Sequence, residues 1–171
     1  MKRISLAVWC TLALATGLVA GEPKELAAAK KDFAQIAHPD EAARAHYVLS
    51  LSALREKLAR SNGDWQAVDA ELKKRPAPKD ADAKTLTAYR LGRWDSPRHQ
   101  YLFRKDGTWT MVPAEPDITH GTWKIEGNQY TDTGVTVGGP PSSSRYTIIL
   151  LTAKEFIFTD GDAVFYEKKV K

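Results

Sequence analysis

The sequence predicts an α+β protein in which an N-terminal helical segment precedes a small antiparallel meander that closes into a β-barrel or half-barrel. Residues 22–75 contain a single glycine and place apolar side chains three and four positions apart, as an amphipathic helix does. Residues 86–171 instead alternate with a period of two and are rich in glycine and aromatic residues. Residues 76–85, with two prolines and no large apolar side chain before residue 86, are expected to be a linker.

Three helices are expected in the helical segment. Pro39 ends the first, and Asp40 and Glu41 begin the second because acidic residues favour the positive end of a helix. Asp64 caps the third. Each helix has an apolar stripe, formed in chain order by Leu26, Ala29, Phe33 and Ile36, by Tyr47, Leu51, Leu54 and Leu58, and by Trp65, Val68 and Leu72.

Eight short strands are expected after the linker. Turn residues that tolerate a positive φ separate several of them, including Gly107, Gly127 and Gly161. Closure of such a meander removes its unpaired edges. The repeated Gly-Thr-Trp marks strand starts, with Trp109, Met111, Trp123 and Ile125 facing inward. The expected strands are 87–94, 99–104, 107–112, 119–125, 128–133, 145–151, 154–159 and 163–169.

The sixth and seventh strands do not alternate cleanly between apolar and polar residues. Tyr146, Ile148 and Leu150 are expected on one face of the sixth strand, and Ile149 and Leu151 on the other. In the seventh strand, Ile157 opposes its two phenylalanine neighbours, Phe156 and Phe158. An outer apolar face needs a cover. The helices are therefore predicted to pack on the outside of these strands through Phe33, Ile36, Leu51, Leu54 and Leu58.

The N-terminus has the pattern of a signal peptide. Lys2 and Arg3 precede the uncharged run Ile4–Ala20, and small residues follow. Residues 1–21 are therefore assigned to a signal peptide, which predicts a secreted or periplasmic protein that meets the membrane only through this segment. An uncleaved anchor is the alternative, since such a run is near the lower limit for crossing a bilayer. The only cysteine, Cys10, lies inside it.

The net charge and the absence of known motifs argue against several classes of function but do not identify one. Without Lys2 and Arg3 the chain has 23 basic and 21 acidic residues, a net charge of +2, which says little about partners. Export makes nucleic acid an unexpected partner. The histidines lack metal-ligand spacing and no nucleophile motif is present, so no catalytic residue, metal or cofactor is expected.

The expected meander begins with Leu91-Gly92-Arg93-Trp94. The sequence from Phe103 to Asn128 repeats the pattern of a glycine two residues before a tryptophan, as Gly-Thr-Trp. Over residues 85–169 the chain resembles bacterial lipocalin-like extracytoplasmic domains, which are small calycin-type barrels. The resemblance implies that Gly92 and Trp94 plug one barrel end, that Lys168 or Lys169 stacks on the indole, and that a small apolar molecule binds. Strands of about six residues leave open whether a cavity remains or side chains fill the barrel.

The stretch from residue 89 to residue 109 interleaves arginines with aromatic side chains, a combination suited to anionic groups, although an ordinary solvated sheet face has the same composition. The leading hypothesis is a non-catalytic binding or interaction module at the cell envelope, for a small apolar ligand or an anionic envelope polymer. A hydrolase using His99 or His120 with a nearby carboxylate, and an adaptor that binds a protein partner through the helices, are the alternatives. The candidate ligand-binding residues are Arg90, Arg93, Arg98, His99, Tyr101 and His120.

Overall fold

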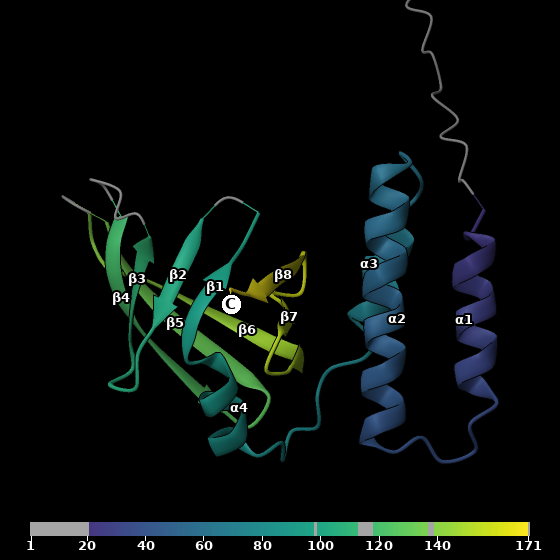
Figure 1. The fold of residues 1–171 in the computed structure, drawn as a ribbon, viewed down its shortest axis with the longest axis horizontal. Helices are drawn as coiled ribbons and strands as arrows, with labels where there is room; N and C mark the ends of the chain where they lie inside the picture. Colours follow the sequence, from purple (N-terminus) through teal and green to yellow (C-terminus); the bar gives the residue numbers. More distant parts are fainter. Residues whose placement is uncertain (1–20, 98, 113–117, 137–138, 171) are drawn as a thin grey trace, which may run out of the picture.

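The α+β prediction is confirmed, and the meander is a fully closed barrel rather than a half-barrel (Figure 1). The structure is a computed structural model that describes residues 21–97, 99–112, 118–136 and 139–170. Residues 1–20, which hold most of the expected signal peptide, lie outside the described residues. Four helices come first, and eight strands then pair in sequence order.

The first three helices form where the sequence predicts them. They are α1 (Lys24–Ala34), α2 (Glu41–Arg60) and α3 (Gln66–Leu72). The Asp40 carboxylate accepts the Ala43 N–H at 2.7 Å and so caps α2. The Asp64 carboxylate accepts the Ala67 N–H at 3.1 Å before α3.

The fourth helix, α4 (Ala83–Arg90), was not predicted. Residues 87–94 were expected to form the first strand, and that prediction is wrong because the strand begins only at Gly92. The Asp82 carboxylate caps α4 by accepting the Lys84 N–H at 3.0 Å. The inward side of this helix carries Leu86 and Arg90, one turn apart, and a buried arginine hides the apolar pattern of so short a helix.

Every neighbouring pair of strands is antiparallel, and β1 closes the barrel on β8 through Trp94 opposite Lys169. Seven of the expected strands form at or near their predicted positions. The strands are β1 (Gly92–Asp95), β2 (Gln100–Phe103), β3 (Thr108–Val112), β4 (Ile118–Glu126), β5 (Gln129–Thr136), β6 (Ser142–Leu151), β7 (Glu155–Thr159) and β8 (Val164–Lys169).

The barrel interior holds an aromatic-rich core, called here the inner cluster. Trp109, Met111, Trp123 and Ile125 belong to it, as the alternation predicts. Gly121 lies within β4 rather than in a turn, and a Cβ there would come 2.6 Å from the Trp109 indole, so this glycine makes room for that ring. The inner cluster consists of Ala77, Trp94, Phe103, Trp109, Met111, Trp123, Ile125, Tyr130, Ile148, Leu151, Phe156 and Phe158.

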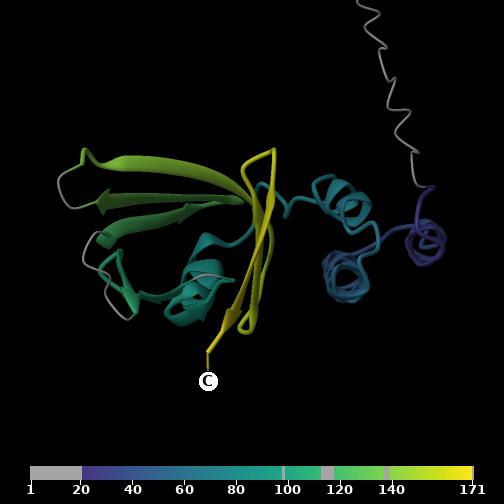
Figure 2. The same ribbon diagram turned by 90° about the horizontal axis from the view of Figure 1, so that it is seen from above.

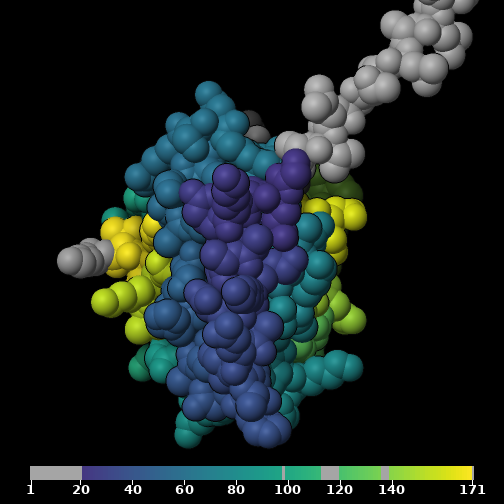
Figure 3. Space-filling model, turned by 90° about the vertical axis from the view of Figure 1, so that its right-hand side faces the viewer, coloured from purple at the N-terminus to yellow at the C-terminus, as the bar shows by residue number. Residues whose placement is uncertain are grey.

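A second core, the outer cluster, lies between the helices and the outside of the barrel. The prediction that helices cover β6 and β7 is confirmed, since α2 contacts β6 and residues of all these elements share one cluster (Figures 2 and 3). Ile36 takes no part in it, because its side chain is 42% exposed, and that part of the prediction is wrong. The outer cluster consists of Leu26, Tyr47, Val48, Leu51, Val68, Leu72, Ile149, Leu150, Ile157 and Val164.

A register shift in β6 assigns its side chains to the two cores. The pairing with β7 shifts between Ile148 and Leu150, so Ile149 and Leu150 both belong to the outer cluster and Leu151 returns to the inner one. Simple alternation placed Leu150 with Ile148, which is wrong. The Ile149 carbonyl accepts a hydrogen bond from Arg44 Nη1 of α2 at 2.8 Å. The bulge therefore attaches the helical layer as well as redirecting side chains.

The segment assigned to a linker is hydrogen-bonded to the barrel. The Ala77 N–H donates to the Ile148 carbonyl at 2.8 Å, and the Asn128 side-chain amide donates to the Ala77 carbonyl at 2.7 Å. Lys73, at the end of α3, donates to the Asp162 carbonyl in the β7–β8 turn at 3.0 Å. These bonds hold the end of α3 and the start of the segment to the barrel.

A candidate binding cavity inside the barrel

One end of the barrel is closed by α4 and the residues that follow it. Gly92 has φ +103, a value that favours glycine, and it turns the chain from α4 into β1. The Trp94 side chain is fully buried, and its indole N–H donates to the Arg90 carbonyl at 2.7 Å. Lys169 Nζ lies 5.5 Å from the centroid of the Trp94 ring. Trp94 is thus buried at this end of the barrel with Lys169 over its indole, whereas Lys168 pairs with Glu56 of α2.

Arg90 extends from the end of α4 into the barrel and forms part of the cavity floor. Its Nη1 donates to Glu167 of β8, and its guanidinium carbon lies 3.7 Å from the centroid of the Phe103 ring and 4.4 Å from that of Phe156. Burial alone would lower the pKa of Arg90, but the Glu167 carboxylate and Tyr130 outweigh it and raise that pKa. The floor thus contains a buried, charge-balanced ion pair.

Above this floor the barrel interior contains a cavity of about 580 Å³ that opens to the outside. It reaches the β1–β2 turn, at the end of the barrel opposite α4, where Ser96, Pro97 and His99 line it. Small-molecule sites in proteins typically have volumes of roughly 300–1,000 Å³. The short strands therefore leave a cavity. Its walls and floor are formed chiefly by Arg90, Tyr101, Phe103, Trp109, Tyr130, Asp132, Tyr146, Phe158, Phe165 and Glu167.

The aromatic walls brace one another. The rings of Phe158 and Phe165 are stacked with centroids 5.2 Å apart, and Tyr146 meets Phe158 edge-on at 5.0 Å. Tyr101 and Trp109 meet edge-on at 5.6 Å on the facing wall. Such pairs favour defined ring orientations. The cavity is therefore bounded by rings that hold their positions without filling the barrel.

Asp132 brings a further charge to this aromatic wall. It lies on β5 two residues after Tyr130, on the same inward face, and its Oδ2 accepts the Tyr130 hydroxyl at 3.3 Å. Burial raises the pKa of the Asp132 carboxyl, and the Tyr130 hydroxyl and Arg90 oppose that rise. Burial likewise raises the pKa of Tyr130, so its hydroxyl keeps its proton as a donor.

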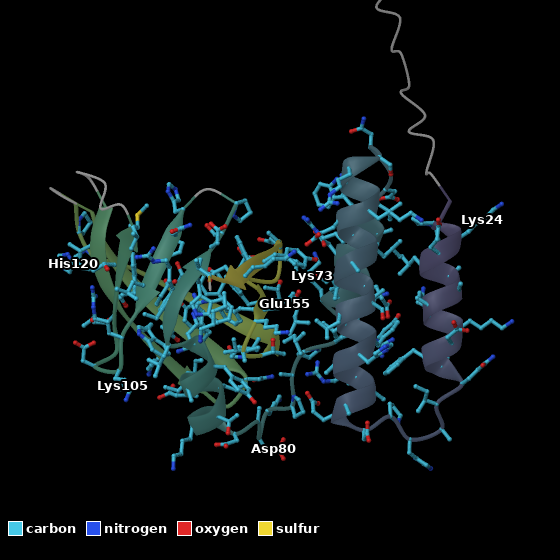
Figure 4. The ribbon with its side chains drawn as sticks, viewed as in Figure 1. Lys24, Lys73, Asp80, Lys105, His120 and Glu155 are labelled. Atoms are coloured by element: carbon cyan, nitrogen blue, oxygen red, sulfur yellow. The ribbon has the colours of Figure 1, made fainter. Side chains whose placement is uncertain are left out.

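The six candidate ligand-binding residues do not gather at one site. Arg90, His99 and Tyr101 line the cavity. Arg93 is exposed on the outside of β1, and His120 is exposed at the outer edge of the barrel (Figure 4). Arg98 lies outside the described residues. The basic stretch therefore does not form one patch, since Arg90 is inside the barrel and Arg93 outside it.

His99 and His120 do not share a site. His99 precedes β2 and lies at the cavity mouth, whereas His120 lies on β4, beyond the intervening strand β3. His120 pairs in register with Thr110 of β3 and Val135 of β5. The two histidines are therefore separated by β3 and lie at different places on the barrel. Among the described residues, no group of three or more His, Cys, Asp or Glu side chains is placed to hold a metal ion.

Sequence reasoning missed the acidic residues of the cavity. Asp132 follows Tyr130 at a spacing of two, and Glu167 follows Phe165 in the same way, so each acid shares the inward face of its strand with an aromatic neighbour. That alternation was available as a signal. The alternation predicts inward positions for apolar residues, and an acid at such a position is not expected because its burial is usually unfavourable.

No family model, curated protein or solved structure matches the chain. Within the described part of the chain, none of the helices combines the length and the apolar character needed to span a bilayer.

Proposed function

We propose that this protein is an exported, lipocalin-like binding protein that holds a small, largely apolar molecule inside its barrel without transforming it. The observation that carries the proposal is the cavity of about 580 Å³, which lies within a closed barrel and is walled by aromatic side chains. A cavity of this size and lining suits a ligand that buries most of its surface against rings.

Two further features support this class of protein. The plug formed by Gly92 and Trp94, with Lys169 over the indole, agrees with the resemblance to lipocalin-like domains. The charged start and uncharged run of residues 1–21 support export. A binding role at the cell envelope unites these features.

Binding is favoured over hydrolysis because of where the histidines lie. Only His99 reaches the cavity, at its mouth, and His120 is on the outer surface. The polar groups deep in the cavity are a paired Arg90–Glu167 couple and Asp132 beside a tyrosine hydroxyl. This arrangement fixes the orientation of a bound molecule rather than joining a base to a nucleophile.

The proposal is tested by titrating the full chain with N-phenyl-1-naphthylamine, a neutral aromatic probe that fluoresces in apolar surroundings. Saturable binding with one site per chain is expected. Phe165→Ala removes a ring of the cavity wall and should weaken binding by about tenfold, the value of roughly half a buried side chain. Phe33→Ala is the matched control, since this ring stacks on Tyr47 in the helical layer.

Absence of saturable binding to the folded protein would overturn the proposal. Equal weakening by Phe165→Ala and Phe33→Ala would also overturn it, because the probe would then not be inside the barrel. Circular dichroism of each variant confirms that both remain folded during the titration.

A further inference from the structure

The charges inside the cavity indicate which polar group a ligand should carry. Resting on the proposed function, we propose that the ligand of this barrel is an amphiphile with an apolar body and a protonated amine, and that Asp132 binds the ammonium group among the surrounding aromatic rings. Three charged side chains line the cavity: one basic residue, Arg90, and two acidic residues, Asp132 and Glu167.

These three charges do not cancel. Arg90 donates to Glu167, and the two side chains are 1% and 8% exposed, so they form a closed pair in the floor. Within the part of the chain that the structure describes, Asp132 remains as one negative charge that forms no ion pair with a basic side chain. Among the described residues, the Tyr130 hydroxyl gives the one side-chain hydrogen bond that the Asp132 carboxylate accepts, and its length of 3.3 Å marks it as weak.

Asp132 is also placed to meet a ligand. It is half-buried on the cavity wall, whereas the Arg90 and Glu167 side chains are almost fully buried where they line the floor. The groups that surround it are Tyr130 on its own strand, Arg90 of α4, Glu167 of β8, and the hydroxyls of Tyr101 and Tyr146. His99 adds a titratable group at the mouth.

The aromatic walls suit a cation more than an anion. Ring faces attract ammonium groups, and the interaction strengthens when water is excluded. An anionic head group would instead meet Asp132 and Glu167, and the only guanidinium lining the described cavity is already paired with Glu167. The cavity thus favours an amine over a neutral ligand and a neutral ligand over a carboxylate.

The experiment compares three probes that share one ring system and differ in charge: 1-naphthylmethylamine, 1-naphthylmethanol and 1-naphthoic acid. Isothermal titration calorimetry at pH 7 measures their affinities for the full chain. The amine should bind about ten- to a hundredfold more tightly than the alcohol, the range expected for one hydrogen bond to a charged group. The acid should bind more weakly than the alcohol.

Two variants locate the effect. Asp132→Asn keeps the shape of the side chain and removes its charge, so the preference for the amine over the alcohol should fall to about twofold or less. Asp95→Asn makes the same change at an exposed residue on the outside of β1 and should leave the preference unchanged. Added salt should weaken amine binding to the wild-type protein only modestly, because the site is partly buried.

The outcomes separate this inference from the proposed function. Binding of the alcohol without any advantage for the amine would overturn the inference and leave the binding function intact, as would an advantage that survives in Asp132→Asn. Failure of all three probes to bind would count against the cavity as a binding site altogether. An advantage that disappears equally in Asp95→Asn would show a general surface attraction and would also overturn the inference.

Discussion

Strands β6 and β7 contribute side chains to both the inner and the outer cluster, and the two clusters are cores of different kinds. Ile148 lies in the inner cluster and its neighbour Ile149 in the outer one, and both are fully buried. Aliphatic residues dominate the outer cluster, and its members Val48, Leu51 and Val68 have no exposed surface. The inner cluster is mostly aromatic and borders a cavity with charged residues.

The difference follows from the shapes of the side chains. Branched aliphatic side chains interdigitate and fill the space between a helix and a sheet. Aromatic rings prefer edge-to-face and offset-stacked contacts, and the rings that make such contacts here line the wall of the cavity. The outer cluster is therefore a filled core, whereas the inner cluster is packed at the floor and borders the cavity in which we propose that a ligand binds.

Removing the helices should have the largest effect on this pair of cores. A fragment of residues 76–171 would keep the barrel and α4 but expose Ile149, Leu150 and Ile157 to water. We expect it to aggregate, or to bind a hydrophobic dye strongly, because a contiguous apolar patch would be uncovered. Size-exclusion chromatography and dye fluorescence check this. A monomeric fragment that ignores the dye would show that the barrel does not need its outer cover.

Removing the Trp94 side chain should destabilise the inner cluster strongly. Trp94→Ala deletes a fully buried indole and should lower the free energy of unfolding by about 3–5 kcal/mol in urea titrations. Trp65→Ala is the control, because Trp65 is half-buried in the helical layer and should cost less. A loss below about 1 kcal/mol at Trp94 would contradict its role as a plug.

The ion pair in the floor provides a sharper test of the inner cluster. Glu167→Gln leaves the buried Arg90 guanidinium without its paired carboxylate and should cost about 3–5 kcal/mol in the free energy of unfolding. Glu126→Gln, at an exposed site paired with Lys124, should cost less than about 1 kcal/mol. The double variant Arg90→Met, Glu167→Leu should recover much of the loss. Equal small losses in both single variants would place Arg90 in contact with water.

The smallest expected effect is a dependence of stability on pH. Burial raises the pKa of Asp132 in the folded protein above the unfolded value of about 3.9. The folded state then binds this proton more tightly, so Asp132 destabilises the fold when ionised and the penalty fades as pH falls through its folded pKa. Asp132→Asn should be more stable than the wild type at pH 7.

Subtracting the two stability profiles isolates Asp132, because every other titrating group is common to both proteins. The difference should shrink as pH falls from the folded pKa toward about 3.9. A constant difference across that range would mean that Asp132 is fully solvated.

The sequence predicts most of the fold because each local signal agrees with the packing. The periods of three to four and of two separate the helices from the strands, and the apolar outer face of Ile157 and Ile149 correctly predicts a cover. The sequence pattern does not predict the fourth helix because one of its inward residues is Arg90. A charge inside a barrel is tolerated here because Arg90 pairs with Glu167. The bulge at Ile149 is not predicted for a similar reason, since a register shift in β6 depends on how β6 pairs with β7.

The site was less predictable than the fold. Arg90, His99 and Tyr101 were selected from one stretch of sequence, and they do line the cavity. Asp132 and Phe165 come from strands far along the chain, and only closure of the barrel brings them to the same space. Local patterns predict which face a residue occupies, whereas the cavity depends on how eight faces meet.

The most direct test of the two-core account is fluorine NMR of the full chain labelled with 5-fluorotryptophan, recorded while N-phenyl-1-naphthylamine is added. Trp109 lines the cavity, and Trp65 lies in the helical layer, where Arg55 stacks on its ring at 4.7 Å. Substitution of each tryptophan by phenylalanine assigns the resonances. The account predicts that the Trp109 resonance shifts with the probe and that the Trp65 resonance stays in place. A shift at Trp65 with none at Trp109 would contradict it, because the probe would then bind at the helical layer and not inside the barrel.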